Sequence, residues 1–170
     1  MQARYTQRVC ADESKINAFL RAARVGVISI HGDDYPYAVP VNFVWDGSSI
    51  YFHGMGSGKK NDLIEKNPKV SFTVFQENGT VSDPVPCHAD TSYFSVMIFG
   101  SCEKVLDHAE GAKALNLLLD KLLPGFYKPD RVSSSMVAGH KSSMDHKPVA
   151  VFKISVSELT AKENAALPNS

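Results

Sequence analysis

Six short apolar segments, each rich in β-branched and aromatic residues, limit this chain to a mainly β fold. The segments lie at residues 25–30, 35–45, 49–53, 70–76, 93–106 and 149–156. Several are joined by connections too short for the crossover that parallel strands require, so these strands run antiparallel. An open sheet would leave exposed edges, which closure into a barrel removes. We therefore expect a six-stranded antiparallel barrel.

Three stretches have helical character and are expected at the edges of the barrel. Residues 12–24 and 107–123 place apolar side chains three and four positions apart. A shorter helix is expected to begin at Ser57, as its N-cap, and to end at Asn67, which precedes a proline. The rest of the chain is expected as turns, two long loops and a polar tail, at residues 77–91, 126–147 and beyond 156.

Two glycines carry local predictions. Asp46-Gly47 is typical of a tight turn between antiparallel strands. Gly100 interrupts the long fifth segment, which indicates a β-bulge or a close approach of another backbone segment.

Composition narrows the class of protein. The 170 residues, 44% of them hydrophobic, suit one globular domain spanning residues 1–170. Lys plus Arg equals Asp plus Glu, at 18 each, so no basic excess points to nucleic acid. No apolar run has the length of a signal peptide or of a membrane span. Three widely spaced cysteines predict free thiols rather than disulfides or a structural zinc site. We expect a cytoplasmic protein without a membrane partner.

Residues 50–68 predict a phosphate site. They read as a strand, a turn loosened by Gly54, Gly56 and Gly58, and a helix whose first turn carries Lys59 and Lys60. Unpaired N–H groups beside two ammonium groups suit a phosphate. The spacing fits neither a Walker loop, nor a dinucleotide fingerprint, nor an esterase elbow. The alternative interpretation is an ordinary solvated glycine-rich turn.

Short motifs occur in a characteristic order along the chain. They are P-V-N-F at 40–43, Y-F-H-G at 51–54, G-K-K at 58–60 followed by Leu63, N-P-x-V at 67–70, Y-x-S-V at 93–96 and F-G at 99–100. In this order and spacing the chain resembles the pyridoxamine 5′-phosphate oxidase-like flavoproteins, and most closely their nitroimidazole-resistance (Nim-type) branch. The resemblance extends over residues 19–162.

The resemblance implies a split β-barrel that dimerises and holds FMN at the dimer interface. Lys59 and Lys60 match the basic pair on the FMN phosphate, and Ser57 is a further candidate ligand. Ser95 occupies the position of a polar cofactor contact, and Phe52 and His53 are expected against the phosphoribityl side. The loop at 133–143 is a candidate contact to the partner's flavin. The stretch of the second strand expected to flank the flavin comprises Tyr37, Ala38, Val39, Pro40, Val41 and Asn42.

The second strand also suits a flavin ring on chemical grounds. Pro40 lacks an N–H and frees one strand edge from ladder pairing, and Asn42 offers an amide. A flat apolar wall with a few polar donors is what an isoalloxazine ring requires.

The chain also departs from the oxidase pattern. Tyr37 and Ala38 stand where the oxidases have a phosphate-binding arginine, and the substrate-binding arginine and histidine of their C-terminus have no counterpart in residues 149–170. The related T-G-K ending reads Thr160-Ala161-Lys162. Oxidation of pyridoxamine phosphate itself is therefore not expected.

Histidines provide the candidates for chemistry. His53 matches the Nim-type His-Gly position, where an imidazole next to the cofactor can donate a proton to a reduced substrate. The alternative is a strand-end histidine that binds only backbone. Cys87-His88 with help from His140 or His146 is a weaker alternative for a metal or haem. No metal site is assigned.

We therefore expect an FMN-dependent reductase that receives electrons from NAD(P)H or a partner protein and passes them to a small organic acceptor such as a nitroaromatic. The sequence contains no visible nicotinamide motif. One alternative is a flavin- or haem-binding protein without turnover, active in storage or sensing. Another is a flavin-free barrel that only dimerises.

Overall fold

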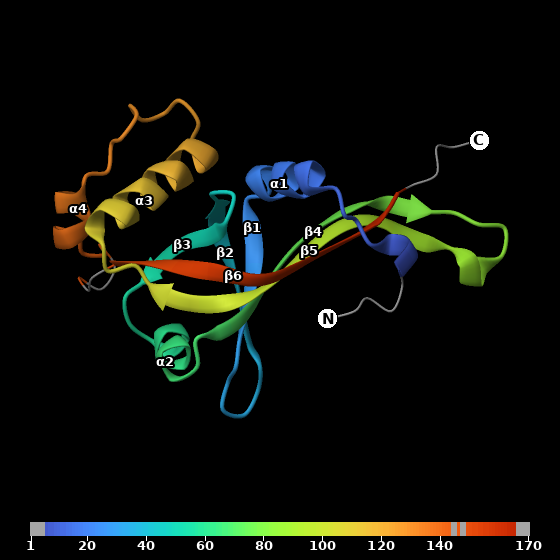
Figure 1. Ribbon diagram of the computed structural model, residues 1–170, viewed down its shortest axis with the longest axis horizontal. Helices are drawn as coiled ribbons and strands as arrows, with labels where there is room; N and C mark the ends of the chain where they lie inside the picture. The colour runs from blue at the N-terminus through green and yellow to red at the C-terminus, as the bar shows by residue number, and fades with distance from the viewer. Residues whose placement is uncertain (1–5, 144–145, 147–148, 166–170) are drawn as a thin grey trace.

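The six predicted strands form a closed antiparallel barrel with helices around it (Figure 1). The computed structural model describes residues 6–143, 146 and 149–165. Around the barrel the strands follow the order β1-β2-β3-β6-β5-β4, and β4 pairs back onto β1. The mainly β prediction is confirmed. The strands are β1 Val25–Ile30, β2 Tyr37–Trp45, β3 Ser49–Met55, β4 Lys69–Val81, β5 Asp90–Lys104 and β6 Val149–Asn164.

Four α-helices lie outside the barrel in the described part of the chain, one more than predicted. They are α1 Glu13–Ala22, α2 Lys59–Lys66, α3 His108–Leu122 and α4 Ser134–Gly139, and two 3-10 turns lie at Thr6–Arg8 and Pro86–His88. The additional helix, α4, falls in the expected loop at 126–147, where six residues are too few to show helical periodicity. Ser133 caps it by accepting a hydrogen bond from the N–H of Met136. Residues 144, 145 and 147 of that predicted loop lie outside the described residues.

Aromatic side chains fill the barrel interior. Phe43, Phe52, Phe72 and Phe152 are fully buried. Phe52 stacks on Phe152 with ring centroids 5.0 Å apart, and Phe43 meets Phe72 edge to face at 5.1 Å. Burying one such side chain contributes about 1.5–3 kcal/mol. Because neighbouring strand residues point to opposite faces, an inward Phe52 places His53 outside the barrel.

β4 and β5 extend beyond the barrel as an arm (Figure 1). The prediction ended the fourth strand at residue 76 and placed a loop at 77–91. In the structure the pairing continues to Val81 and Asp90, through a register shift between Glu77 and Gly79. The shift explains the error, because a bulge interrupts the alternation on which strand prediction depends.

β6 likewise runs further than predicted. Its second half was expected as a polar tail, but it pairs with the arm as far as the Tyr93–Asn164 pair. This half is exposed or only partly buried over most of its length, so it lacks the apolar alternation of a core strand. Residues 166–170 of the expected tail lie outside the described residues.

The two glycine predictions are confirmed. Gly47 has φ 108°, and the carboxylate of Asp46 accepts hydrogen bonds from the N–H groups of Ser48 and Ser49, each at 2.8 Å. The β5–β6 register shifts between Phe99 and Gly100. A Cβ at Gly100 would collide with the carbonyl oxygen of Ser155, so the close approach of β6 requires glycine there.

α3 covers one side of the barrel through a second apolar cluster. Buried residues from α3, β2, β3 and β6 form it, namely Val44, Tyr51, Ala114, Leu118 and Val151. Lys121 near the end of α3 donates to the carbonyl oxygens of Leu20, at 3.2 Å, and Phe43, at 3.1 Å. Burial lowers the pKa of Lys121 to about 8. One lysine thereby connects α3 to the last turn of α1 and to β2.

All three cysteines are free thiols, as predicted, with Cys10 and Cys102 buried and Cys87 exposed. Burial raises the pKa of Cys102 to about 12, so this thiol is unreactive. Among the described residues, no helix combines the length and the apolar character needed to cross a membrane.

Candidate functional site

The barrel opens between β2 and β3. The two strands pair only through Phe43, Val44 and Trp45 of β2. Residues 37–42 keep their ladder with β1, and within the described residues no strand pairs with their other edge. The end of β3, from His53 to Met55, pairs with β6 instead. Pro40 lies in the unpaired stretch, as expected for a residue without an N–H.

α2 begins beside this opening, at Gly58 and not at Ser57. The N-cap is Gly58, whose φ of 103° is a left-handed conformation that favours glycine. The prediction of a Ser57 cap is therefore wrong, because the chain enters the helix through a turn that only Gly58 adopts easily. Ser57 is exposed and makes no cap hydrogen bond. The N–H groups of Lys59 and Lys60 belong to the first turn and have no intrahelical acceptor.

Lys60 is a half-buried cation that no described carboxylate pairs with. Its Nζ lies over the stacked rings of Phe52 and Phe152, at 5.2 and 4.9 Å from their centroids. Burial lowers the pKa of the Lys60 ammonium below its ordinary 10.5. Burying a charge without a partner is costly, so an anion at this position would be stabilised.

Gly54 makes room for this ammonium. A Cβ built on Gly54 would lie 2.5 Å from Nζ of Lys60. Any side chain at position 54 would therefore displace the charge, which gives the glycine of the Y-F-H-G motif a steric role.

Lys59 lies at the same helix start, with its side chain toward β2. Its Nζ is 5.3 Å from the ring centroid of Tyr37, and it forms no ion pair with the described residues. The two lysines and two free N–H groups thus occupy one helix start, next to the strand that the sequence predicts to flank a flavin.

The six predicted contacts on β2 divide between its two faces. Ala38, Pro40 and Asn42 are exposed, whereas Tyr37, Val39 and Val41 are partly buried and pack against the core. The Nδ2 group of Asn42 donates to the carbonyl of Arg24 at 3.1 Å. One N–H of this amide is thus engaged, which leaves the second N–H and the Oδ1 acceptor for a ligand.

Phe52 and His53, both expected against the phosphoribityl side of the flavin, point to opposite faces of β3. Phe52 has no exposed surface, and its ring lies beneath the ammonium of Lys60. His53 is exposed and lies against apolar side chains of α3 and β6. Burial, followed by the positive charge of Lys60, lowers the pKa of His53 below 6.5. The imidazole is mainly neutral at pH 7.

Ser95 lies far from α2 on the same chain. It pairs with Phe75 and Lys162 on the arm. Cys102 marks the part of β5 that is near Lys60, because the lysine charge acts on its pKa. Ser95 is seven positions away from Cys102 along β5, about 23 Å at strand spacing. One protomer therefore does not bring Ser95 to the two lysines.

His53 borders an apolar pocket of about 340 Å³ between the barrel and α3. A second histidine, His140, follows α4 and lines the same pocket. The remaining walls are aliphatic, namely Leu115, Leu118, Leu119, Leu122, Leu123, Val132, Met136, Val137, Val149 and Val151. From the sequence, His140 is expected only as an additional ligand beside Cys87-His88. No helical periodicity predicts α4, the helix that His140 follows.

The predicted combination of Cys87-His88 with His140 is wrong. His88 lies at the tip of the arm, where Asp83 is 3.4 Å from its Nδ1, and α4 lies at the other end of the molecule (Figure 1). No group of three or more potential metal ligands gathers among the residues that the structure describes.

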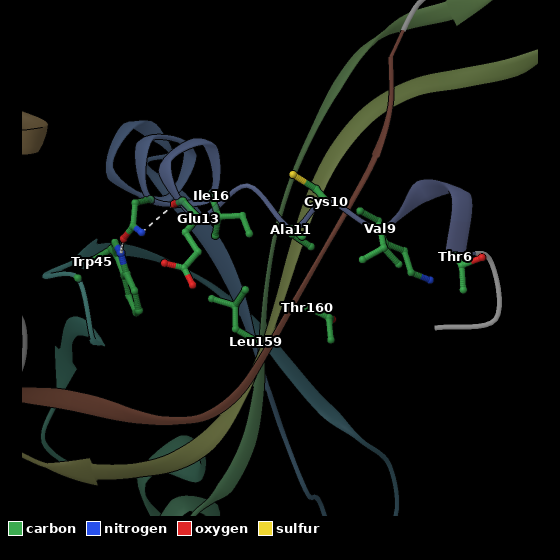
Figure 2. A pocket seen from close by; sticks show the side chains of 13 residues that line it. Thr6, Val9, Cys10, Ala11, Glu13, Ile16, Trp45, Leu159 and Thr160 are labelled. Atoms are coloured by element: carbon green, nitrogen blue, oxygen red, sulfur yellow. Dashed lines mark hydrogen bonds between the residues drawn. The ribbon is translucent and has the colours of Figure 1, made fainter. Parts of the chain in front are cut away.

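Another hollow, of about 680 Å³, lies between α1 and β6. Figure 2 shows Cys10 and Ile16 on its α1 side, and Leu159 and Thr160 on β6. Trp45 donates to Asn17 at 2.7 Å across one end. The described residues that line this hollow include no pair of cations or imidazoles. The paired lysines and the paired histidines lie instead beside α2 and α3.

The family model described as pyridoxamine 5′-phosphate oxidase matches residues 12–163. No curated protein matches the chain at a significant level.

Solved structures share the fold at low identity. The flavocytochrome Anf3 from Azotobacter vinelandii has a TM-score of 0.80 and 23% identity, over 99% of this chain and 75% of that one. An FAD and haem binding protein from Mycobacterium smegmatis has a TM-score of 0.75 and 17% identity, over 96% and 76%. A protein described as a candidate 5-nitroimidazole antibiotic resistance protein from Bacteroides thetaiotaomicron has a TM-score of 0.71 and 23% identity, over 91% and 85%.

Proposed function

The chain belongs to the pyridoxamine 5′-phosphate oxidase family, and from its site we propose that it is an FMN-binding reductase that acts as a homodimer. A flavin supplies two-electron and one-electron chemistry that no side chain offers. The residues of this chain would bind it, orient it and limit access to it.

The half-buried ammonium of Lys60 at the start of α2, which no described carboxylate pairs with, carries the proposal. A phosphate there gains a cation in a partly desolvated position, the N–H groups of the first helical turn and a second cation, Lys59. Ser57 adds an exposed hydroxyl. This combination suits the terminal phosphate of FMN.

The unpaired edge of β2 suits the flavin ring. Backbone groups of residues 37–42 that are not bonded to β3 are available to the polar edge of an isoalloxazine, and Ala38 and Pro40 offer small apolar surface beside them. In this arrangement the ring lies along β2 and the phosphate lies at α2.

A second copy of the chain fits the outer face of the sheet. Directly paired residues share a face, and one uncharged row crosses five strands through Pro40, Val27, Thr73, Met97 and Thr160. Phe75 beside this row is 69% exposed, and it pairs with Ser95. A copy bound here would cover the uncharged row and Phe75, and would bring the partner's Ser95 toward the flavin.

His53 is the residue that we propose to face a small acceptor, with NAD(P)H or a partner protein as the electron source. The lowered pKa suits a neutral imidazole that accepts or relays a proton rather than one that is stored as a cation. The neighbour described as a candidate nitroimidazole resistance protein makes nitroaromatics the first acceptors to test. Oxidation of pyridoxamine phosphate is not part of the proposal.

The test is an anaerobic flavin titration of the purified protein followed by NADH. We expect retained yellow colour after desalting, bleaching by NADH and re-oxidation by a nitroaromatic. Lys60→Met should lose the colour, whereas Lys66→Met, at the exposed end of the same helix, should keep it. Colour that NADH does not bleach would favour the non-catalytic flavin binder, and failure to retain FMN would contradict the proposal.

A further inference from the structure

The pocket of His53 and His140 has a composition that neither a flavin nor a bare metal ion requires. Its walls are aliphatic apart from the two imidazoles. An isoalloxazine needs polar partners along its pyrimidine edge, and a bound metal ion generally needs three or more protein ligands. The pocket offers neither of these sets among the described residues.

Both imidazoles are available as ligands. Neither side chain makes a hydrogen bond or an ion pair with any described residue. They come from separate elements, His53 from β3 and His140 from the end of α4.

The mouth of the pocket is apolar and exposed. Leu123 and Met136 line the pocket and are 45% and 44% exposed. Lys141 follows His140 and is exposed, and Lys60 lies close enough to His53 to influence its charge. The pocket therefore has an apolar interior, two imidazoles that can act as ligands, and cations near its rim.

We propose that this pocket binds one haem per protomer, with His53 and His140 as the axial ligands of its iron. A porphyrin is flat and apolar over most of its surface, which the leucine walls accept. Its iron takes imidazole ligands. Its two propionates would leave through the mouth toward Lys141. In the haem-loaded protein His53 is an iron ligand and not a proton carrier.

The experiment is a hemin titration of the full-length protein, with absorbance and electron paramagnetic resonance spectra of the ferric form. We expect saturation at one haem per chain and a low-spin, six-coordinate signal. His53→Ala and His140→Ala should each convert the iron to a high-spin form, and added imidazole should restore the low-spin spectrum. His88→Ala, a histidine at the tip of the arm, should leave the spectrum unchanged.

Two results would overturn the assignment. One is the absence of saturable binding, and the other is an unchanged spectrum in both pocket variants, which would place the haem elsewhere. The double variant Lys59→Met with Lys60→Met separates this inference from the flavin proposal. It should lose FMN while keeping a low-spin haem, because the two sites are assigned to different ligand groups.

Discussion

Among single residues, Gly54 and Lys60 form the most sharply defined pair of the site. The space that glycine leaves is filled by the ammonium of Lys60, 2.5 Å from where a Cβ would be. In Gly54→Ala the flexible lysine end moves, so we expect the fold to persist and the Kd for FMN to rise about tenfold, close to 1.4 kcal/mol. Fluorescence titration measures the Kd and thermal unfolding checks the fold. Gly139→Ala, where a Cβ meets nothing within 4 Å, is the matched control and should bind normally.

The protonation of Lys60 gives the flavin site a pH dependence. An anion binds the charged lysine, whose pKa is lowered by burial, so affinity for FMN should fall as pH rises through that pKa, earlier than for a lysine at 10.5. The stability of the ligand-free protein changes in the opposite direction. Lys60 keeps its proton to higher pH in the unfolded chain than in the folded protein, so the free energy of unfolding rises with pH over the same range. Titrations from pH 7 to 10 test this. An affinity that stays flat over that range, or a fall that persists in Lys60→Met, would contradict it.

Among the elements, α3 depends on Lys121 for its attachment. The side chain satisfies the carbonyls of Leu20 and Phe43, both of which belong to fully buried residues. Lys121→Met keeps the length of the chain but leaves two acceptors unsatisfied, so we expect a loss of about 1–3 kcal/mol in the free energy of unfolding. Urea denaturation measures it. Lys113→Met, an exposed lysine of the same helix, should change stability by less than about 0.5 kcal/mol; similar losses in both variants would remove the special role of Lys121.

At the scale of the whole molecule, the dimer and the flavin site are linked by the outer sheet face. Met97 belongs to the uncharged row and is 41% exposed. A charge there, as in Met97→Lys, would be buried without a partner in the proposed dimer, so we expect monomers in light scattering and weaker FMN retention. Glu77→Lys, toward the arm's tip, is the control. A dimer that tolerates Met97→Lys would contradict the choice of face.

The sequence predicts the barrel well because each inner strand alternates between buried and exposed positions, as β1 does. It fails where that alternation stops, along the arm after Glu77 and in the outer half of β6. The position of Lys59 and Lys60 at a helix start is predicted from the three glycines before them. The N-cap residue of α2 is not, because Ser57 and Gly58 are both suitable N-cap residues. His140 could not be placed, because six residues of α4 show no period and only tertiary packing brings it beside His53.

Comparison of FMN with riboflavin tests the central claim most directly, because riboflavin has the same ring and no phosphate. We would measure the Kd of both ligands for the native protein and for Lys59→Met with Lys60→Met. Charge-assisted hydrogen bonds contribute about 1.5–3 kcal/mol each. The account therefore predicts that the native protein binds FMN at least tenfold more tightly than riboflavin, and that the double variant loses this preference. Equal affinity of the native protein for both ligands would contradict the assignment of the phosphate to α2.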